Sequence, residues 1–402
     1  MQSLEEYIHK NWDKTVRITT SELLAKNKTL LFLPKPYTVP CMDTHFQELY
    51  YWDTYFTNRG LILSNRIDMA INNIFNFAYL IDKYGFIPNG SRTWYLNRSQ
   101  PPFLGMMISD VYKETGDKAF LLWALEALKK EHVFWDTKRK TANGLNCYSA
   151  TPTLEECRDI IQCYYERTGI QRLDNELYWG INILAEAESG WDFNARFSGK
   201  CHEYNPVDLN CLLYFDEKFI AKAERILGLS DGEEWDARAA QRKSIMYSYM
   251  LGSDGVLYDY SYVEGAKSLL KSAASFMPYF VGLETDNRGA KELLSALELP
   301  FGVAATEELC GVNYQWGYKN GWACLQLIAV EGLRNCALSQ EANRISEGFI
   351  RVVENVFEQS GKVLEKYNIF DGNANAIGEY GTPEMLGWTA GVYLALKDVM
   401  VR

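Results

Sequence analysis

The segment "ESGWDFNARF", Glu188 to Phe197, places an acidic residue, Asp192, between Trp191 and Phe193. A carboxylate that two large apolar rings shield from water has a raised pKa, because burial disfavours the charged form. Such a group can donate a proton near neutral pH, so Asp192 is a candidate general acid. The alternative is an ordinary surface Asp192 whose two aromatic neighbours turn into the core.

Helical periodicity dominates the chain and places Asp192 directly after a helix. In "ELYWGINILAEAESG" apolar residues recur at helical spacing until Gly190, a residue typical of helix ends. For one further helix we expect Ser99 as N-cap, and for the last we expect Thr382 as N-cap with Pro383 in its first turn. Comparable patterns predict helices over 66–83, 100–115, 118–135, 208–227, 235–250, 263–275, 321–337, 341–358 and 384–399.

No alternating strand pattern accompanies these helices, so the predicted fold class is all-α. Paired helices joined by loops of unequal length suit a closed ring of helical hairpins, in which function lies on the rim loops. No linker divides the 402 residues, so we expect a single domain over residues 1–402. The irregular segments expected at the rim are 34–47, 84–99, 143–158, 189–207, 300–320 and 361–383.

The composition favours a neutral small molecule as partner. A net charge of -11 disfavours nucleic acid and anionic membrane surfaces, which bind through clustered Lys and Arg. The 26 Tyr and 11 Trp residues permit a sugar site, because their rings offer an apolar face beside a hydrogen-bonding edge. The 4 histidines stand far apart, so no metal site is expected.

The N-terminal segment and the cysteines both favour a protein that stays inside the cell. "MQSLEEYIHKNWDK" has acids and no apolar core, so neither a signal peptide nor a transmembrane helix is expected there. The 9 cysteines are odd in number and form no Cys-x-x-Cys pair, which predicts reduced and mostly buried thiols. We therefore expect a cytoplasmic location.

Several segments in chain order together resemble the trehalase family of glycoside hydrolases. They are "FQELYYWDTYF", "GFIPNGSRTWYLNRSQPP", "SGWDFNARF", "PVDLN", "QWGYKNGW" and "LEKYN". The resemblance runs from about Ser3 to the end of the chain, and its Asn-Gly-Ser-Arg and Asn-Arg-Ser-Gln-Pro-Pro elements are highly specific. It implies an (α/α)6 toroid that acts without a cofactor as an inverting, exo-acting α-glucoside hydrolase, first of all an α,α-trehalase that releases two glucose molecules.

The resemblance also implies a catalytic pair. Asp192 matches the family's general acid, and Glu365 in "LEKYN" matches its general base. An inverting glycosidase needs a protonated acid and an ionised base, roughly 6.5 to 9.5 Å apart so that a water molecule fits between base and sugar. Lys366 and Tyr367 would help to keep Glu365 charged. From its local sequence alone, Glu365 could instead be a solvated acid on an extended segment.

Further matches imply a pocket for the glucose that is cleaved. A sugar presents a ring of hydroxyl groups, so its pocket needs convergent donors and acceptors. Taken singly, Arg98 could pair with a surface acid and Asn89 could be a turn residue, while Trp52 and Trp316 could be either stacking platforms or core. The substrate-binding residues implied by the resemblance are Phe46, Trp52, Asp53, Asn89, Arg98, Gln100, Trp316 and Glu379.

The chain departs from the family pattern mainly around the leaving group. His45 in "PCMDTHF" and Gln47 stand where the family has Arg. Thr-Pro-Thr at 151–153 replaces an Arg-Pro-Glu that contacts the leaving sugar, and Gly317 replaces an Asp. "FDGNANAIG" replaces the glycine run of a lid before Glu379. His45 could take over a sugar contact or be an ordinary hydrogen-bonded residue.

Other functions stay open at this point. The departures allow an α-glucosidase of the same fold with another leaving group, such as one that acts on glucosylglycerate or glucosylglycerol. A catalytically silent sugar-binding protein would bind trehalose without turnover. Sugar epimerases commonly use histidine acid–base pairs, which the widely spaced histidines do not favour. The sequence indicates no oligomeric state.

Overall fold

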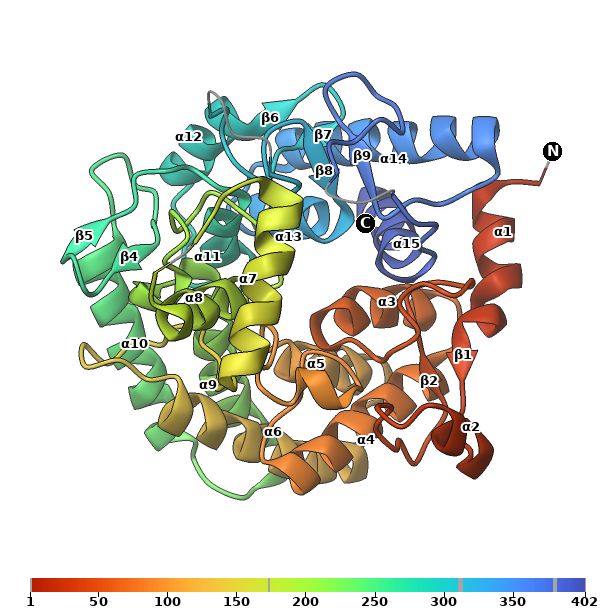
Figure 1. Ribbon diagram of the computed structural model, residues 1–402, viewed down its shortest axis with the longest axis horizontal. Coiled ribbons are helices and arrows are strands. Elements are labelled where there is room, and N and C mark those ends of the chain that lie inside the picture. Colours follow the sequence, from red (N-terminus) through yellow and green to blue (C-terminus); the bar gives the residue numbers. More distant parts are fainter. Residues whose placement is uncertain (1, 173, 310–313, 379–381, 402) are drawn as a thin grey trace.

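Within the described residues, six helices lie in a series in which each contacts the next (Figure 1). The last of them, α15, also contacts the first, α3, so the series returns on itself. The six are α3 (Tyr51–Leu63), α5 (Leu104–Thr115), α9 (Val207–Leu227), α11 (Met277–Phe280), α13 (Ala323–Asn335) and α15 (Gly387–Val401). The computed structural model describes residues 2–172, 174–309, 314–378 and 382–401.

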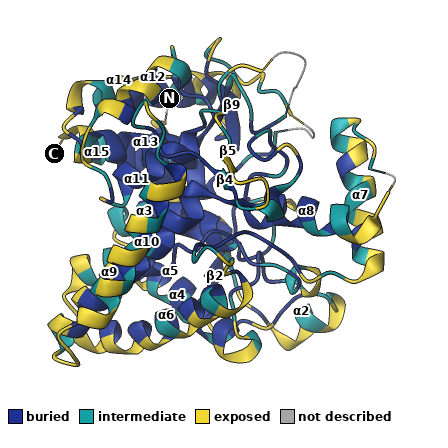
Figure 2. Cartoon of the chain, turned by 90° about the vertical axis from the view of Figure 1, so that its left-hand side faces the viewer, coloured by how far each residue is buried: buried dark blue, intermediate teal, exposed yellow. Residues whose placement is uncertain are grey.

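A second set of helices covers the outside of this ring. The inner helices α3, α13 and α15 are buried over most of their residues, as expected of helices that are apolar all round. The outer helices bury one face and expose the other, which Figure 2 shows as blue and yellow sides. They are α1 (Leu4–Asn11), α4 (Ile67–Tyr84), α6 (Lys118–Lys138), α10 (Glu233–Met250), α12 (Arg288–Leu297) and α14 (Ser339–Ser360).

Glycine residues allow the first and last inner helices to pack closely. A Cβ atom on Gly391 of α15 would lie 2.0 Å from the carbonyl oxygen of Phe56 on α3. A Cβ atom on Gly60 of α3 would lie 2.5 Å from the Cα atom of Gly391. Since neither approach leaves room for a side chain, these glycines bring α3 and α15 together at the point where the ring returns on itself.

Two helices stand apart from the ring and contact each other. They are α7 (Leu154–Thr168) and α8 (Glu176–Glu188). In Figure 2, α7 projects from the body of the molecule on the right. A short helix, α2 (Ser21–Lys26), lies near the N-terminal end.

Short antiparallel strand pairs tie the loops together. The pair β8 (Asn320–Trp322) and β9 (Lys366–Asn368) joins the start of α13 to the segment that follows Glu365. The others are β1 (Val16–Arg17) with β2 (Tyr37–Thr38), β4 (Tyr260–Ser261) with both β3 (Tyr204–Asn205) and β5 (Ala266–Lys267), and β6 (Glu298–Leu299) with β7 (Gly302–Val303).

Most of the predicted helices are present, and the chain is mainly helical as expected. Elements α4, α5, α6, α8, α9, α10, α13 and α14 begin and end within a few residues of the predicted bounds. Gly190 adopts a left-handed conformation, φ +78°, just past the end of α8, as predicted for a helix terminus. Helices α1, α2, α3, α7, α11 and α12 were not predicted.

The predicted helix over 263–275 is wrong. Gly265, with φ +67°, turns the chain there, and β5 pairs with β4 instead. Val263 is 61% exposed and Leu269 is 70% exposed, so these apolar residues do not form a core face. Only a 3-10 turn, Ala273–Phe276, is helical at the end of the segment.

Both predicted N-caps are wrong as well. Helix α15 begins at Gly387, because the preceding segment is extended: the Met385 amide donates to Val363 and the Pro383 carbonyl accepts from the Glu365 amide. Helix α5 begins at Leu104, since the residues before the prolines at 101 and 102 favour extended backbone. Both segments belong instead to loops that line a cavity.

The other sequence-based expectations concern membranes, cysteines and metals. Among the described helices, none is both long and apolar enough to cross a membrane. The described cysteines are free thiols, and all of them except Cys163 are buried, while Cys310 lies outside the described residues. Within the described part of the chain, no cluster of three His, Cys, Asp or Glu residues is arranged to hold a metal ion.

Candidate active site

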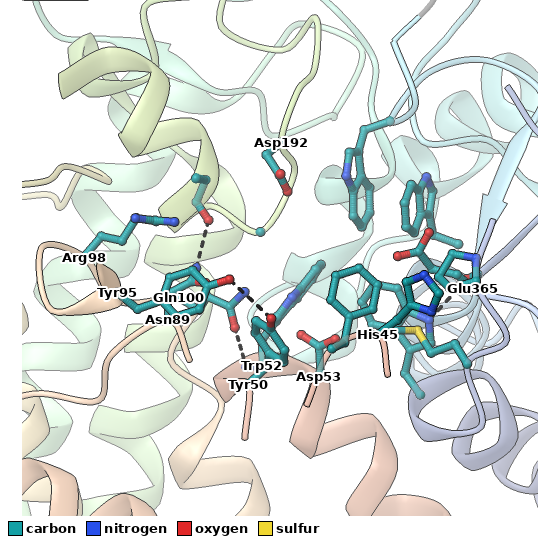
Figure 3. A pocket seen from close by; sticks show the side chains of 18 of the residues that line it. His45, Tyr50, Trp52, Asp53, Asn89, Tyr95, Arg98, Gln100, Asp192 and Glu365 are labelled. Carbon is teal, nitrogen blue, oxygen red and sulfur yellow. Dashed lines mark hydrogen bonds between the residues drawn. The ribbon is translucent and has the colours of Figure 1, made fainter. Parts of the chain in front are cut away.

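A cavity of about 540 Å³ lies where the loops of the ring meet (Figure 3). Sites for small molecules commonly measure roughly 300 to 1,000 Å³. Glu379 lies outside the described residues. The cavity wall contains all the other predicted site residues: Phe46, Trp52, Asp53, Asn89, Arg98, Gln100, Asp192, Trp316 and Glu365. The structure therefore brings together residues from five separate segments of the chain.

Asp192 faces the cavity while its two aromatic neighbours are buried in the walls. Trp191 stacks on Trp316 at 5.1 Å between ring centroids, and Phe193 contacts Tyr164 edge to face at 4.7 Å. The Asp192 side chain keeps 40% of its surface exposed, towards the cavity. The two sequence interpretations are thus both partly right: the rings turn into the core, and the acid stays in a sheltered hollow.

The surroundings of Asp192 raise the pKa of its carboxyl group. Burial is the largest cause, and the charge of Glu365 adds to it. The guanidinium groups of Arg167 and Arg98 act in the opposite direction. A carboxyl whose pKa lies above its usual range is more often protonated near neutral pH, which a general acid requires.

A buried arginine holds the loop that carries Asp192. Arg196 pairs with Asp208 at 2.9 Å and with Asp259 at 2.9 Å. Its guanidinium also lies 4.6 Å from the centre of the Trp191 ring. Asp208 belongs to the motif "PVDLN". It holds Arg196, and Arg196 packs against the Trp191 ring next to the acid.

Glu365 lines the same cavity as Asp192, and Figure 3 shows it at the right of the view, apart from Asp192 at the top. Its side chain is only 3% exposed, and the wholly buried Lys366 donates to its Oε2 atom at 2.6 Å. The Lys366 ammonium in turn lies 4.8 Å from the centre of the Trp322 ring. Glu365 is thus a buried carboxyl group paired with Lys366 and not the solvated acid that its local sequence allowed.

Asp53 is a third carboxyl group that lines the cavity. It stands in the first turn of α3 and is 8% exposed. Burial raises the pKa of Asp53 to about 7, and the charges of Glu365 and Asp192 contribute. Near neutral pH such a carboxyl is protonated part of the time, so it can donate as well as accept a hydrogen bond.

Polar side chains from the segment 89–100 line the cavity beside Asp53. The Asn89 amide nitrogen donates to the carbonyl groups of Ser99 at 3.3 Å and Ala187 at 3.2 Å. The Gln100 Oε1 atom accepts from the Trp52 amide at 3.2 Å. These bonds hold both side chains by one end, so that the other end of each amide group can serve a ligand.

Arg98 is enclosed by the cavity wall. Its guanidinium lies 5.0 Å from the centre of the Tyr95 ring and donates to Asn97 at 2.8 Å. Burial lowers the pKa of Arg98, with Tyr95 and Asp192 acting against that effect. The Arg98 Nε atom is buried and has no hydrogen-bond partner among the described residues. Arg98 is therefore not the surface ion pair that its sequence also allowed.

Stacked aromatic rings form another part of the cavity wall. Trp316 stacks on Trp322 at 3.8 Å between centroids with an interplanar angle of 3°. Trp52 lies against Trp316 at 5.8 Å, and a Cβ atom on Gly190 would lie 2.7 Å from the Trp52 ring. Since Trp52 is 3% exposed and Trp316 is 2% exposed, both rings pack as core while lining the cavity.

The segment 45–47 forms part of the rim. His45 lines the cavity but pairs with Asp43 at 3.0 Å, and its side chain is 64% exposed. Phe46 also lines the cavity, with a φ of +45°. Gln47 does not line it and instead accepts from Arg17 at 2.8 Å.

Arg167 lines the cavity and was missed by the sequence analysis. It lies in the last turn of α7, and its Nη1 atom donates to the Asp192 Oδ2 atom at 3.3 Å. The residues at 151–153 precede α7, with Thr153 as its N-cap, and do not line the cavity. No local signal marked Arg167, because "YYERTG" is a typical polar helix end. Tyr50, Tyr95 and Trp388 were missed too. Tyr50 and Tyr95 lie in segments that resemble the family, whereas for Trp388 the aromatic type alone was the available signal.

A buried ion pair fixes two of the cavity loops. Arg139 donates to both carboxylate oxygens of Glu188 at 2.8 Å. Glu188 also accepts from the backbone amides of Ser99 and Ser149, each at 2.7 Å. One carboxylate therefore connects the end of α8 to the loop that carries Arg98 and Gln100.

We expect Arg139→Met to lower the free energy of unfolding by about 3 to 5 kcal/mol, because it leaves the Glu188 charge buried without its partner. The matched control is Arg158→Met, which breaks a pair with Glu176 in which the side chains are 61% and 47% exposed. An exposed pair contributes about 1 kcal/mol or less. Denaturant unfolding of both variants measures the difference, and equal losses would contradict the structural role given to Glu188.

A comparison with known protein families shows to which family the chain belongs. The family model described as Trehalase matches residues 1–400. The chain belongs to the trehalase family. A periplasmic trehalase of Xanthomonas campestris pv. campestris is 33% identical over 428 residues, covering 99% of this chain and 73% of that protein. A periplasmic trehalase of Pseudomonas aeruginosa is 35% identical over 408 residues, covering 93% of this chain and 73% of that protein.

One solved structure agrees with membership of the trehalase family, and another shares the fold. The neutral trehalase of Saccharomyces cerevisiae is 26% identical and matches with a TM-score of 0.79, over 99% of this chain and 80% of that one. A mannosylglycerate hydrolase of Thermus thermophilus is 16% identical, with a TM-score of 0.61 over 91% of this chain and 96% of that one. The second likeness shows a shared fold only.

The expected cytoplasmic location is wrong, because these trehalase-family relatives are named periplasmic. The composition of a folded domain reflects its solubility and its partners. It carries no targeting information, since transport signals are separate segments that other proteins recognise. Free, buried cysteines likewise do not identify a compartment.

Proposed function

We propose that this chain is an inverting, exo-acting α-glucoside hydrolase that cleaves α,α-trehalose with water to two glucose molecules. The observation that carries the proposal is the pair Asp192 and Glu365, which come from remote segments and line one cavity (Figure 3). The names of the relatives and of the yeast structure support trehalose as substrate.

In the proposed reaction Asp192 is the general acid and Glu365 the general base. Asp192 gives its proton to the bridging oxygen as the bond from that oxygen to C1 breaks. Glu365 takes a proton from a water molecule whose oxygen attacks C1 from the opposite face. The attacked ring becomes β-glucose, and the leaving ring departs as α-glucose. The paired Lys366 supports an ionised Glu365, and the raised pKa of Asp192 supports its protonated form.

The proposed binding residues surround the glucose ring to be cleaved. The partly protonated Asp53 and the held amide groups of Asn89 and Gln100 offer both donors and acceptors. Arg98 supplies further donors from an enclosed position. The aromatic residues supply apolar faces for the sugar. The proposed set is Phe46, Trp52, Asp53, Asn89, Arg98, Gln100 and Trp316, and Glu379 remains a prediction from the sequence.

We further propose that residues 1–402 form one (α/α)6 catalytic domain. The closed series of contacts among α3, α5, α9, α11, α13 and α15 supports the inner ring. The outer helices between them support the alternation of inner and outer elements (Figure 1). The match of the family model over residues 1–400 supports a single unit.

A second candidate is a hydrolase of the same fold with another leaving group. It is favoured by the rim: His45 pairs with Asp43, and the segment 151–153 does not line the cavity. The family contacts to the leaving sugar that the sequence lacks are therefore not replaced at the same positions. Substrates such as glucosylglycerate or glucosylglycerol belong to this candidate.

Hydrolysis followed by proton NMR tests the proposal. The purified protein is given trehalose, glucosylglycerate and glucosylglycerol in parallel, and kcat/KM is compared among them. We expect the highest value for trehalose, with β-glucose and α-glucose appearing first in equal amounts. α-Glucose alone as the first product would rule out inversion, and a higher value for another glucoside would establish the second candidate. Binding of trehalose by calorimetry without glucose release would establish a silent sugar-binding protein.

A further inference from the structure

The helix α7 reaches the cavity from outside the ring. It contacts α8 and projects from the body of the molecule, with most of its residues at least partly exposed (Figure 2). Its buried residues are only Cys157 and Tyr164, yet Arg167 at its last turn lines the cavity. Packing alone does not explain why this surface helix places one charged side chain in the cavity.

Resting on the hydrolase function proposed above, we propose that Arg167 binds the leaving group and orients Asp192. In this arrangement α7 is the wall of the leaving-group site. Arg167 is then a determinant of specificity that the sequence did not reveal, and it occupies a different position from 45, 47 and 151–153, where the sequence lacks the family's basic residues.

The geometry places Arg167 beside the acid. Its Nη1 atom donates to the Asp192 Oδ2 atom at 3.3 Å, and its guanidinium centre lies 5.7 Å from the Phe193 ring. The Arg167 side chain is 31% exposed, so part of it faces the cavity. A guanidinium has five N–H donors in a planar fork, so it can donate to Asp192 and to a ligand at the same time.

The depth of the cavity assigns the two sugar positions. Asp53, Asn89 and Gln100 belong to the ring and the loops beneath it, and all three are at most 8% exposed. An exo-acting enzyme takes the terminal glucose into this closed end. The general acid contacts the bridging oxygen, so the leaving group lies beyond Asp192, towards the mouth where α7 stands. Arg167 is the charged side chain that α7 supplies there.

The charges around Asp192 indicate that Arg167 does not serve to keep the acid protonated. Among the described residues, the charged groups that act on Asp192 include Arg167 from α7, Arg98 from the loop before α5, Asp53 from α3 and Glu365 from the segment before β9. The guanidinium of Arg167 lowers the pKa of Asp192 and so opposes the protonated form. Its position is explained if it holds the carboxyl in one orientation and binds the leaving group.

Arg167→Ala separates these roles when two substrates are compared. Trehalose needs both a proton on its bridging oxygen and a site for its leaving sugar. With α-glucosyl fluoride the C1–F bond breaks, fluoride leaves without a proton, and water attacks C1 while Glu365 takes the water proton. Neither the acid nor the leaving-group site is then needed. We expect kcat/KM for trehalose to fall about tenfold to a hundredfold, mainly through KM, because hydrogen bonds to a charged group are lost. The loss on the fluoride is expected to be at least tenfold smaller.

The pH profile adds a readout that a purely structural role would not move. The protonated acid sets the basic limb of the kcat/KM profile for trehalose. Since Arg167 lowers the pKa of Asp192, its removal is expected to shift that limb to higher pH, and Arg167→Lys should restore part of the limb and of the rate. The matched control is Arg158→Ala on the same helix, whose partner is Glu176 and which does not line the cavity.

The outcomes separate this inference from the function on which it rests. An equal loss on trehalose and on the fluoride, or an unmoved basic limb, would overturn the role of Arg167 while leaving the hydrolase intact. A wild-type protein that hydrolyses neither substrate would overturn the proposed function and this inference with it. Thermal unfolding midpoints of the variants show that a selective loss on trehalose does not come from misfolding.

Discussion

Asp192→Asn is expected to lower kcat for trehalose by at least about a hundredfold, the contribution of a general acid. Asparagine has nearly the same shape but no proton to give, so the leaving sugar would have to depart as an alkoxide. The residue faces a cavity and its burial raises the pKa of its carboxyl, which fits a proton donor. Initial rates of glucose release measure the effect.

The substrate comparison makes this result specific to acid catalysis. On α-glucosyl fluoride, whose leaving group needs no proton, Asp192→Asn should lose much less activity than on trehalose. The basic limb of the trehalose profile should also disappear, because that limb reports ionisation of the acid. A rate on trehalose within about threefold of the wild-type rate would remove Asp192 from the role of proton donor.

Glu365→Gln is expected to lower the rate on both substrates, by about a hundredfold to ten-thousandfold. Both reactions need a water molecule to lose a proton as it attacks C1, and an amide cannot accept that proton. The contrast with Asp192→Asn is the test: one variant is selective for trehalose and the other is not. Wild-type rates on either substrate would contradict the role of Glu365 as base.

Stability must be measured alongside these rates. Lys366 is wholly buried and donates to Glu365 at 2.6 Å, so Glu365→Gln removes the negative charge of this buried pair. Loss of one partner of a buried ion pair costs about 3 to 5 kcal/mol of stability. Rates are therefore compared at a temperature well below the unfolding midpoint of the variant. The double variant Glu365→Gln with Lys366→Met removes the charge imbalance and should recover stability without recovering activity.

Much of the helical framework could be predicted from the sequence. Long segments such as 118–135 and 208–227 repeat their apolar residues at helical spacing, and this local pattern is enough to specify a helix. The predictions were wrong where tertiary pairing opposed the pattern. The segment 263–275 has apolar residues at helical spacing but pairs as strands around Gly265. The segment before α15 is extended because it pairs with the residues next to Glu365.

Amino-acid type and motif order by themselves determined the family, the candidate acid Asp192, the candidate base Glu365 and seven further residues that line the cavity. They could not reveal Arg167, because a single Arg at a helix end is ordinary and becomes part of a site only when α7 is placed over the cavity. They also could not decide whether Glu365 is solvated or buried. Those facts depend on distances between remote segments, which are decided by packing such as the close approach of Gly60 and Gly391, and not by any local pattern.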